Sequence, residues 1–381
     1  MDINNSERNP GYRRLKILVV IMVAVFVAAG VYVASNYKHI SNLIKVVAIV
    51  RTQSLYPADS AQMIDGAITG IVDSLDDPYS VYLEPKTFAM LQEQVKGSFG
   101  GLGILVGIKD NSLTVVRAYE GTPAARAGIE AGDVIVGIND TDAGGIDLET
   151  AITLMRGPVG STINLTVNRA SSPLQFTIAR EEISIPTVEG RVIDGSGVGY
   201  IFISQFTERT PEEMTAALAN LQESEIKGLI LDLRDNPGGE LMSAVNVARN
   251  FISQGPIVYI DYRTGKDLEL PSGGQTINLP LVVLINGGSA SAAEILAGAV
   301  KDTGAGTLVG TKTFGKGVVQ TLYQLDNGAG LKLTTARYLT PNKNDINKKG
   351  IEPDVPVQPQ APPLDPQLDK AFEIIMQKIA G

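Results

Sequence analysis

From Gly199 onward, short apolar segments alternate with amphipathic ones, and this alternation constrains the fold more than any other feature of the chain. Two of the apolar segments, Leu229–Leu231 and Leu281–Ile285, are uninterrupted, as expected of strands that are covered on both faces of a sheet. The predicted strands and helices are, in order, Gly199–Ile203, Pro211–Leu221, Gly228–Arg234, Leu241–Ile252, Leu281–Asn286 and Ala292–Lys301. Strands that alternate with helices in this way predict an α/β domain.

The region from Gly100 to Glu182 has a different character, because short β-branched runs are separated by glycines. Helical patches at Pro123–Ala127 and Leu148–Met155 interrupt these runs. The predicted strands are Gly103–Ile108, Leu113–Val116, Val134–Ile138, Ile163–Asn168 and Leu174–Ala179. Short strands with two intervening helices predict a small β-barrel domain that precedes the α/β domain.

Composition limits the chemistry that this chain can perform. The 381 residues include no cysteine and one histidine, His39, which excludes thiol nucleophiles, disulfides, zinc ribbons and iron–sulfur clusters. A lone histidine so near the N-terminus also excludes a Ser-His-Asp triad or a two-His metal site in the rest of the chain. We therefore expect no metal and no cofactor, and acid–base chemistry that depends on Lys, Tyr, Asp or Glu. The net charge of -9 argues against nucleic acid as a partner.

Residues Ile17–Ala34 form an uninterrupted run of 18 uncharged, mostly apolar residues. As a helix that rises about 1.5 Å per residue, this run nearly spans the roughly 30 Å hydrocarbon core of a membrane. The basic residues that precede it are Arg8, Arg13, Arg14 and Lys16. The positive-inside rule then predicts a membrane-anchored protein whose later residues face the cell surface or the periplasm. A cleaved signal peptide is the alternative interpretation, and it also exports the chain.

A small helical module is predicted next. Apolar residues recur at helical spacing from Met63 to Val72, and Leu75-Asp-Asp-Pro78 ends this helix before a second one near Pro85–Gln94. The apolar stripe could pack on the main body of the chain or on a second copy, which would give a homodimer. The pattern does not separate these two alternatives.

Ser291 lies at or just before the start of a helix, in a segment where a buried strand runs through small residues into that helix. Backbone N–H groups without helical partners, such as that of Ala292, can stabilise an oxyanion at such a position. The simpler interpretation is a capping box formed by Ser291 and Glu294, since most serines at this position only cap a helix. Capping does not explain the surrounding glycines and alanines, which leave room for a substrate backbone.

The segment Gly310–Gln320 matches most of a phosphate-binding P-loop. Two features argue against that interpretation. Gly317 occupies the position where the motif needs Ser or Thr to hold magnesium, and the following Val318–Tyr323 is rich in strand-forming residues rather than helical.

If the segment from Lys316 is a strand, its period of two places Lys316, Val318 and Gln320 on one face. Lys316 could then meet Ser291, with Gln320 beside it to orient the amine. A serine hydroxyl needs a base, and a lysine that burial keeps neutral near pH 7 can serve. A solvated surface lysine is the alternative.

Three segments resemble, in order and spacing, a PDZ domain of the bacterial protease type. They are Gly100-Gly-Leu-Gly-Ile104, Gly121-Thr-Pro-Ala-Ala-Arg-Ala-Gly-Ile129 and Ala131-Gly-Asp-Val-Ile135. The resemblance implies that the turn formed by Gly101, Leu102, Gly103 and Ile104 presents N–H groups to a peptide's C-terminal carboxylate, and that the peptide adds to the sheet edge as a strand. Arg156 resembles an arginine implicated in sensing bound peptide.

Four further motifs occur in the order found in the carboxyl-terminal processing proteases, the tail-specific Ser-Lys peptidases of family S41 with a crotonase-like core. They are Leu231-Asp-Leu-Arg-Asp-Asn-Pro-Gly-Gly239, Gly288-Ser-Ala-Ser-Ala-Ala-Glu294, Gly315-Lys-Gly317 with Gln320, and Lys349-Gly-Ile-Glu-Pro-Asp354. This resemblance spans about residues 55–355. It implies that Ser291 is the nucleophile, that Lys316 is the general base and that Gln320 positions the lysine. It also implies an oxyanion hole made by the N–H groups of Ala292 and of Gly238 or Gly239.

The expected architecture is therefore mixed α/β and β, with a membrane helix, a helical module, a PDZ β-barrel and a crotonase-like α/β peptidase core. The expected segments are a cytoplasmic N-terminus 1–16, a transmembrane signal-anchor 17–35, a helical module 55–96, a PDZ domain 99–183, a Ser-Lys peptidase core 184–358 and a C-terminal extended segment and helix 359–381. The expected function is that of an extracytoplasmic serine endopeptidase that binds the C-terminal tails of proteins and cleaves them through an acyl-enzyme.

Two alternatives stay open. One is a catalytically inactive PDZ scaffold, in which Ser291 caps a helix and Lys316 is exposed. The other is an enzyme of the crotonase type acting on acyl thioesters, against which the export signal argues.

Overall fold

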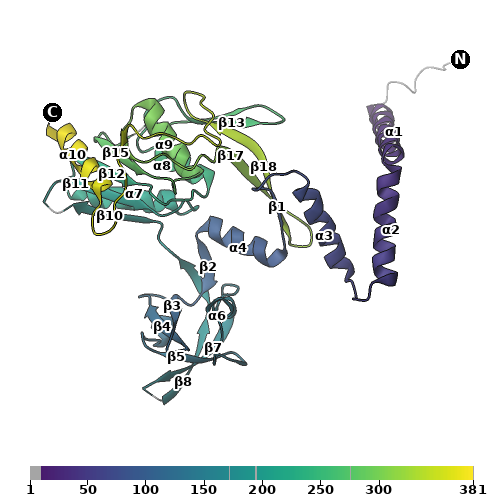
Figure 1. The fold of residues 1–381 in the computed structure, drawn as a ribbon, viewed down its shortest axis with the longest axis horizontal. Helices are drawn as coiled ribbons and strands as arrows, with labels where there is room; N and C mark the ends of the chain where they lie inside the picture. Colours follow the sequence, from purple (N-terminus) through teal and green to yellow (C-terminus); the bar gives the residue numbers. More distant parts are fainter. Residues whose placement is uncertain (1–9, 171, 194, 275, 381) are drawn as a thin grey trace. The chain divides into compact units, whose positions relative to one another are not determined.

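The computed structural model describes residues 10–170, 172–193, 195–274 and 276–380 (Figure 1). The chain divides into two compact units, with the boundary between Asp76 and Asp77. The first unit contains the helices α1 (Pro10–Ser35), α2 (Tyr37–Gln53) and α3 (Ser60–Asp73). The Asp59 carboxylate caps α3 by accepting hydrogen bonds from the N–H groups of Ala61 and Gln62.

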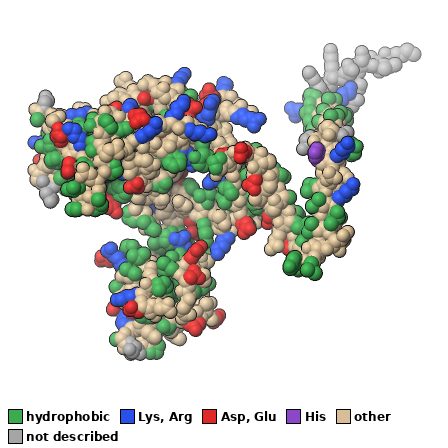
Figure 2. Space-filling view, in the orientation of Figure 1, with side chains coloured by type: hydrophobic (Ala, Val, Ile, Leu, Met, Phe, Trp, Pro, Cys, Tyr) green, Lys and Arg blue, Asp and Glu red, His purple; other side chains and the backbone are tan. Residues whose placement is uncertain are grey.

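Many apolar side chains of the first unit lie on its surface (Figure 2), including Ile17, Phe26 and Ile44. In the part of the chain that the structure describes, however, no helix has both the length and the apolar character needed to cross a membrane. The predicted transmembrane signal-anchor at residues 17–35 is therefore wrong.

Helix α3 leaves much of its predicted apolar stripe in contact with solvent. Ile64 and Ile71 are exposed, and Val72 is buried. Packing of this stripe on a second copy of the chain stays a prediction.

The second unit contains the predicted β-barrel region, in which one sheet has the strand order β3-β4-β5-β7-β8, with β6 paired to β5. The strands are β3 (Ile104–Lys109), β4 (Ser112–Ala118), β5 (Val134–Ile138), β6 (Thr141–Asp142), β7 (Thr162–Arg169) and β8 (Ser172–Ala179). Helices α5 (Pro123–Ala127) and α6 (Leu148–Met155) accompany the sheet, and alternate residues such as Ile163, Leu165 and Val167 face its core. Strands β2 (Ser98–Gly101) and β9 (Glu181–Ser184) pair as an antiparallel ribbon. This ribbon links the beginning and the end of the β-domain to the rest of the second unit.

The predicted α/β domain is confirmed. Its sheet has the order β10-β11-β12-β15-β16-β19, and from β11 to β19 all neighbouring strands are parallel. The strands are β10 (Val188–Ile193), β11 (Val198–Ile203), β12 (Gly228–Asp232), β15 (Leu281–Ile285), β16 (Thr307–Gly310) and β19 (Val355–Pro356). Every residue of β12 and β15 is buried, because helices cover both faces of the sheet.

The two faces of this sheet are covered by different helices (Figure 1). On one face, Leu229 and Leu231 share a hydrophobic core with α7 (Thr210–Glu223), α8 (Leu241–Ala248) and α9 (Ala292–Thr303). On the other face, Ile230 packs with α10 (Pro366–Ala380).

A second sheet has the order β1-β18-β13-β14, with β17 also paired to β18. Its strands are β1 (Val81–Leu83), β13 (Pro256–Tyr262), β14 (Leu268–Pro271), β17 (Val318–Gln324) and β18 (Gly330–Leu339). Helix α4 (Pro85–Lys96) follows β1. Because β1 pairs with β18, residues near position 80 lie beside the hairpin that follows Lys316.

Candidate active site

Ser291 is held in a strained backbone conformation between β15 and α9. Its φ is 54° and its ψ is -116°, a region that a residue other than glycine rarely adopts and that often marks a functional position. The preceding turn is braced by Ser289, whose hydroxyl donates to Leu233 O at 2.7 Å and accepts the N–H of Asn286 at 3.0 Å. The serine is therefore presented by a rigid turn at the start of a buried helix.

Glu294 connects this turn to the loop that carries Lys316. The glutamate is fully buried, and its Oε2 accepts the backbone N–H groups of both Ser291 and Lys316 at 2.9 Å. Its Oε1 accepts the Gly315 N–H at 2.8 Å and the Thr313 hydroxyl at 2.6 Å. Glu294 thus binds the Ser291 N–H as a capping box requires, and the same carboxylate also binds a segment that is distant in sequence, which no local sequence pattern indicates.

The Lys316 loop packs closely against residues that follow β18. The Gly315 O accepts the Lys348 N–H at 2.7 Å, and a Cβ added at Gly317 would lie 2.7 Å from the Asn347 nitrogen. Glycines on both sides of Lys316 permit this approach. The motif around Lys349 is therefore the support for the loop.

Tyr338 provides a further connection between the two candidate residues. Its buried hydroxyl lies 2.6 Å from Lys316 O and 3.0 Å from Ser291 O. Burial and the Glu294 charge raise the pKa of Tyr338 well above 10.0, so the hydroxyl remains a hydrogen-bond donor.

The predicted strand differs in detail from the observed one. It begins at Val318 rather than at Lys316, and its register shifts between Val319 and Gln320. Lys316, Val318 and Gln320 nevertheless line one cleft together with Ser291. The loop conformation, rather than strand periodicity, places Lys316 in the cleft. The strand that follows is also unlike the helix that a P-loop requires.

The environment of Lys316 favours a neutral amine. Burial lowers the pKa of Lys316 below 10.5, and the Lys332 charge lowers it further, whereas Asp77 and Glu294 act in the opposite direction. The Nζ lies 4.8 Å from the centroid of the Tyr79 ring. Within the described ranges, the amine donates no hydrogen bond to Gln320, whose Nε2 is 3.4 Å from Thr334 Oγ1.

The turn after β12 lies directly against Ser291. A Cβ added at Gly238 would be 2.8 Å from Ser291 Cβ and 2.9 Å from the Ala292 nitrogen. The turn is held by buried Asn236, whose Nδ2 donates to Ile203 O at 2.8 Å and whose Oδ1 accepts the Gly238 N–H at 2.9 Å.

These contacts distinguish the two glycines proposed for an oxyanion hole. The Gly238 N–H is already bound to Asn236. In the described part of the chain, no acceptor takes the Gly239 N–H. The Ala292 N–H, at the first position of α9, has no partner within the helix. Gly239 and Ala292 both line the cleft that contains Ser291.

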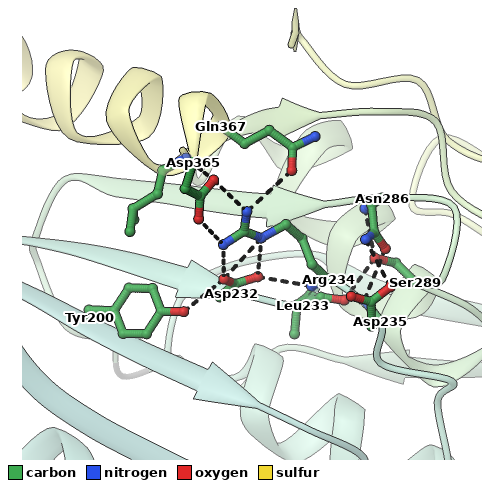
Figure 3. A network of polar contacts seen from close by, with 10 residues as sticks. Tyr200, Asp232, Leu233, Arg234, Asp235, Asn286, Ser289, Asp365 and Gln367 are labelled. Atoms are coloured by element: carbon green, nitrogen blue, oxygen red, sulfur yellow. Dashed lines mark hydrogen bonds and ion pairs between the residues drawn. The ribbon is translucent and has the colours of Figure 1, made fainter. Parts of the chain in front are cut away.

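A charged network holds the C-terminal helix to the strand that precedes this turn (Figure 3). Arg234 donates to Asp232 Oδ2 at 2.6 Å and to Asp365 Oδ1 at 2.8 Å, and its Nη1 is 3.2 Å from Gln367 Oε1. The Tyr200 hydroxyl donates to Asp232 at 2.8 Å. The network therefore joins β11, β12 and the start of α10.

The predicted peptide-binding turn lies between β2 and β3, and β3 is an edge strand of its sheet. Gly103 has a φ of 73°, and a Cβ there would lie 2.3 Å from the Thr122 side chain, so this position requires glycine. Among the described residues, the N–H groups of Leu102 and Gly103 donate to no acceptor. Ile104 begins the edge strand, which leaves a backbone edge beside the turn.

Arg156 lies where the PDZ region meets α4. Its guanidinium carbon is 4.1 Å from the centroid of the Phe99 ring, and its Nη1 is 4.0 Å from Glu93 Oε2. Helix α4 also contributes Leu91 and Gln94 to the lining of the cleft.

No group of three or more His, Cys, Asp or Glu side chains suited to a metal ion occurs among the residues that the structure describes. The polar residues that line the cleft include Ser291, Lys316, Lys332, Gln320 and Glu240.

Comparisons with known proteins agree with this organisation. Residues 197–357 match the model of peptidase family S41, residues 114–169 match a PDZ domain, and residues 27–87 match the N-terminal domain of the activating protease CtpB. The chain is 40% identical over 337 residues to a carboxy-terminal-processing protease of Bartonella bacilliformis, covering 86% of this chain and 77% of that protein. It is 36% identical over 327 residues to the carboxy-terminal processing protease CtpB of Bacillus subtilis, covering 84% and 68%.

A solved structure is also similar. The photosystem II D1 C-terminal processing protease superposes with a TM-score of 0.52 at 32% identity, covering 88% of this chain and 92% of that one. The chain therefore belongs to the carboxy-terminal processing proteases of peptidase family S41, and it is a serine-type, C-terminal processing peptidase.

Proposed function

We propose that this peptidase cleaves the C-terminal tails of proteins with Ser291 as the nucleophile and Lys316 as the general base. The observation that carries the proposal is the double role of Glu294, which accepts the backbone N–H groups of both residues at 2.9 Å and so holds them at one cleft. The lowered pKa of Lys316, caused first by burial, leaves a larger fraction of the amine neutral near pH 7.

The proposed reaction follows from these positions. The neutral Lys316 amine takes the proton of the Ser291 hydroxyl as its oxygen attacks the peptide carbonyl carbon. The N–H groups of Ala292 and Gly239 stabilise the negative oxygen of the tetrahedral intermediate. As the intermediate collapses, the Lys316 ammonium protonates the leaving amine, and the acyl group remains on Ser291. A water molecule, deprotonated by the same amine, then releases the acyl group as a carboxylate.

Gln320 is proposed as the residue that positions the lysine. It lines the same cleft and lies beside Thr334 on the neighbouring strand. Its amide can accept a hydrogen bond from the Lys316 ammonium when the amine carries the serine proton.

We further propose that the PDZ region captures the substrate's C-terminus. The N–H groups of Leu102 and Gly103 suit a terminal carboxylate, and the β3 edge suits an extended peptide. Arg156 would transmit this binding to the cleft, because it pairs with Glu93 of α4 and the same helix lines the cleft. Amidation of a substrate's C-terminus should raise its KM, whereas binding that is indifferent to amidation would contradict carboxylate capture.

We propose that the enzyme acts outside the cytoplasm. Basic residues that precede an apolar run form the pattern of a secretory signal. Fractionation of cells that produce the full chain would test this, and an exclusively cytoplasmic enzyme would contradict it.

The catalytic proposal is tested with Ser291→Ala and Lys316→Ala, assayed on unfolded polypeptides with apolar, uncharged C-termini. Each variant should lose turnover by at least about a thousandfold while its unfolding midpoint changes little. Lys312→Ala is the matched control, because Lys312 is exposed and pairs with Glu352 on the surface. Full activity in Ser291→Ala would favour another mechanism, and peptide binding without any cleavage by the unaltered chain would favour the PDZ scaffold. Turnover of acyl thioesters would favour the crotonase-type alternative.

A further inference from the structure

The amine of Lys316 lies over the aromatic ring of a residue near the start of the second unit. The Nζ is 4.8 Å from the centroid of the Tyr79 ring, and Tyr79 belongs to the segment that begins the second compact unit. Tyr79 is only partly buried, so its ring does not merely fill the hydrophobic core. Its position at the candidate base requires a separate explanation.

The turn that carries Tyr79 is held in place on both sides of the ring. The Ser80 hydroxyl donates to Asp77 Oδ2 at 2.5 Å, and the Tyr79 N–H donates to Asp77 Oδ1 at 3.2 Å. Ser80 is buried, and its hydroxyl accepts the Thr334 N–H at 3.0 Å. Strand β1 follows at once and pairs with β18, with Val81 opposite Lys332. The ring is therefore fixed to the strand beside the Lys316 loop.

We propose that Tyr79 is a positioning residue for Lys316, whose ring face directs the amine toward the cleft and shields it from water. The inference rests on the proposed role of Lys316 as the general base. A general base must lie within hydrogen-bonding reach of the proton that it removes, and a flexible lysine side chain satisfies this only when its surroundings restrict it. Among the described residues no hydrogen bond restrains the amine, so the ring supplies the restraint that is otherwise missing.

Burial and the neighbouring charges determine in which direction the pKa of Lys316 should change when the Tyr79 ring is removed. Lys332 opposes the protonated form, whereas Asp77 and Glu294 favour it. A ring face also attracts an ammonium group, but burial is the largest influence on the pKa of Lys316 and lowers it. Removal of the ring admits water to the amine, and the pKa of Lys316 should therefore rise.

The experiment compares Tyr79→Ala and Tyr79→Phe in the full chain. Tyr79→Ala should lower kcat at pH 7 by at least about tenfold with KM changed less than about threefold, because a misplaced catalytic group affects turnover more than binding. The acid limb of its kcat/KM profile should move to higher pH. Tyr79→Phe keeps the ring, so its kcat and its KM should stay within about twofold of those of the unaltered enzyme. Tyr323→Ala is the matched control, since Tyr323 is an exposed tyrosine of β17 that does not line the cleft.

A second measurement does not depend on peptidase activity. In the Ser291→Ala background, the Lys316 amine can be labelled with trace acetic anhydride across a pH range and quantified by mass spectrometry. Tyr79→Ala should shift this titration to higher pH, and Tyr79→Phe should not. A folded Tyr79→Ala variant with an unchanged kcat, pH profile and labelling titration would overturn the inference. If Lys316→Ala instead retained activity, the proposed base would fail, and that result is separate from any outcome at Tyr79.

Discussion

A carboxylate oxygen of Glu294 accepts the backbone N–H of Lys316 at 2.9 Å, although the two residues are 22 positions apart. The same oxygen accepts the N–H of Ser291. Because the glutamate is fully buried, hydrogen bonds from these neighbouring groups stabilise its carboxylate, and it can accept them only while both segments remain in place. The relative position of the proposed nucleophile and base therefore depends on one buried side chain.

Glu294→Gln should impair both stability and turnover. The amide has one acceptor oxygen where the carboxylate has two, so at least one buried N–H loses its acceptor, at a cost of about 1–3 kcal/mol in unfolding free energy. Displacement of the Lys316 loop should lower kcat by about tenfold to a hundredfold. Urea unfolding and steady-state kinetics measure the two effects. Glu223→Gln, at the exposed end of α7, is the control. It should change the unfolding free energy by no more than about 0.5 kcal/mol and kcat by no more than about twofold.

Gly238→Ala should strongly lower turnover through steric conflict. The new Cβ would lie 2.7 Å from Ala290 O and 2.8 Å from Ser291 Cβ, so the turn must move away from the serine. Displacement of an oxyanion donor costs about a hundredfold to a thousandfold in kcat. Gly255→Ala is the control, because its φ of +82° is similar but its added Cβ meets nothing within 4 Å. That variant should lose about 1–2 kcal/mol of stability and keep its kcat. Equal kinetics in both variants would contradict the close-contact argument.

Lys332→Gln should shift the pH dependence of the enzyme. Lys332 lowers the pKa of Lys316, and burial lowers it more. The proposed mechanism requires the neutral amine, so kcat/KM should rise as the pH increases through the pKa of Lys316 in the free enzyme. Loss of the Lys332 charge raises that pKa, and the acid limb should move to higher pH. Lys332→Arg keeps the charge and should keep the profile. Lys266→Gln, on an exposed loop, serves as the remote control, and identical profiles for Lys332→Gln and the unaltered enzyme would exclude the charge effect.

Arg234→Met should destabilise the peptidase core. Its side chain is 17% exposed and that of Asp232 is 3% exposed, so removal of the guanidinium leaves a buried carboxylate without its cationic partner. Such a loss costs about 3–5 kcal/mol. Arg337→Met removes a pair with Asp261 in which the arginine is 56% exposed, and it should cost no more than about 1 kcal/mol. Denaturant unfolding of both variants provides the comparison, and similar losses would show that burial of the Arg234 network has no energetic consequence.

Local sequence patterns predicted much of the fold. The continuous apolar segments at Leu229–Leu231 and Leu281–Ile285 identify the buried strands β12 and β15, because burial on both faces removes polar alternation. Apolar character alone wrongly predicted a membrane anchor at Ile17–Ala34, since no helix in the described part of the chain has both the length and the apolar character of a membrane span. Periodicity also misplaced the start of the strand after Lys316, because a register shift interrupts the alternation.

The sequence by itself determined the residue types that can perform the chemistry. With one His and no Cys, it excluded the common nucleophile and base pairs, and its motifs pointed to Ser291 and Lys316 as candidates. Only the tertiary structure decided how Glu294 joins their backbones and which glycine N–H of the turn is bound by Asn236. It also decided that Tyr79 covers the lysine amine. The physical reason is that these are contacts between segments far apart along the chain, whose approach depends on packing of the whole unit rather than on any local propensity.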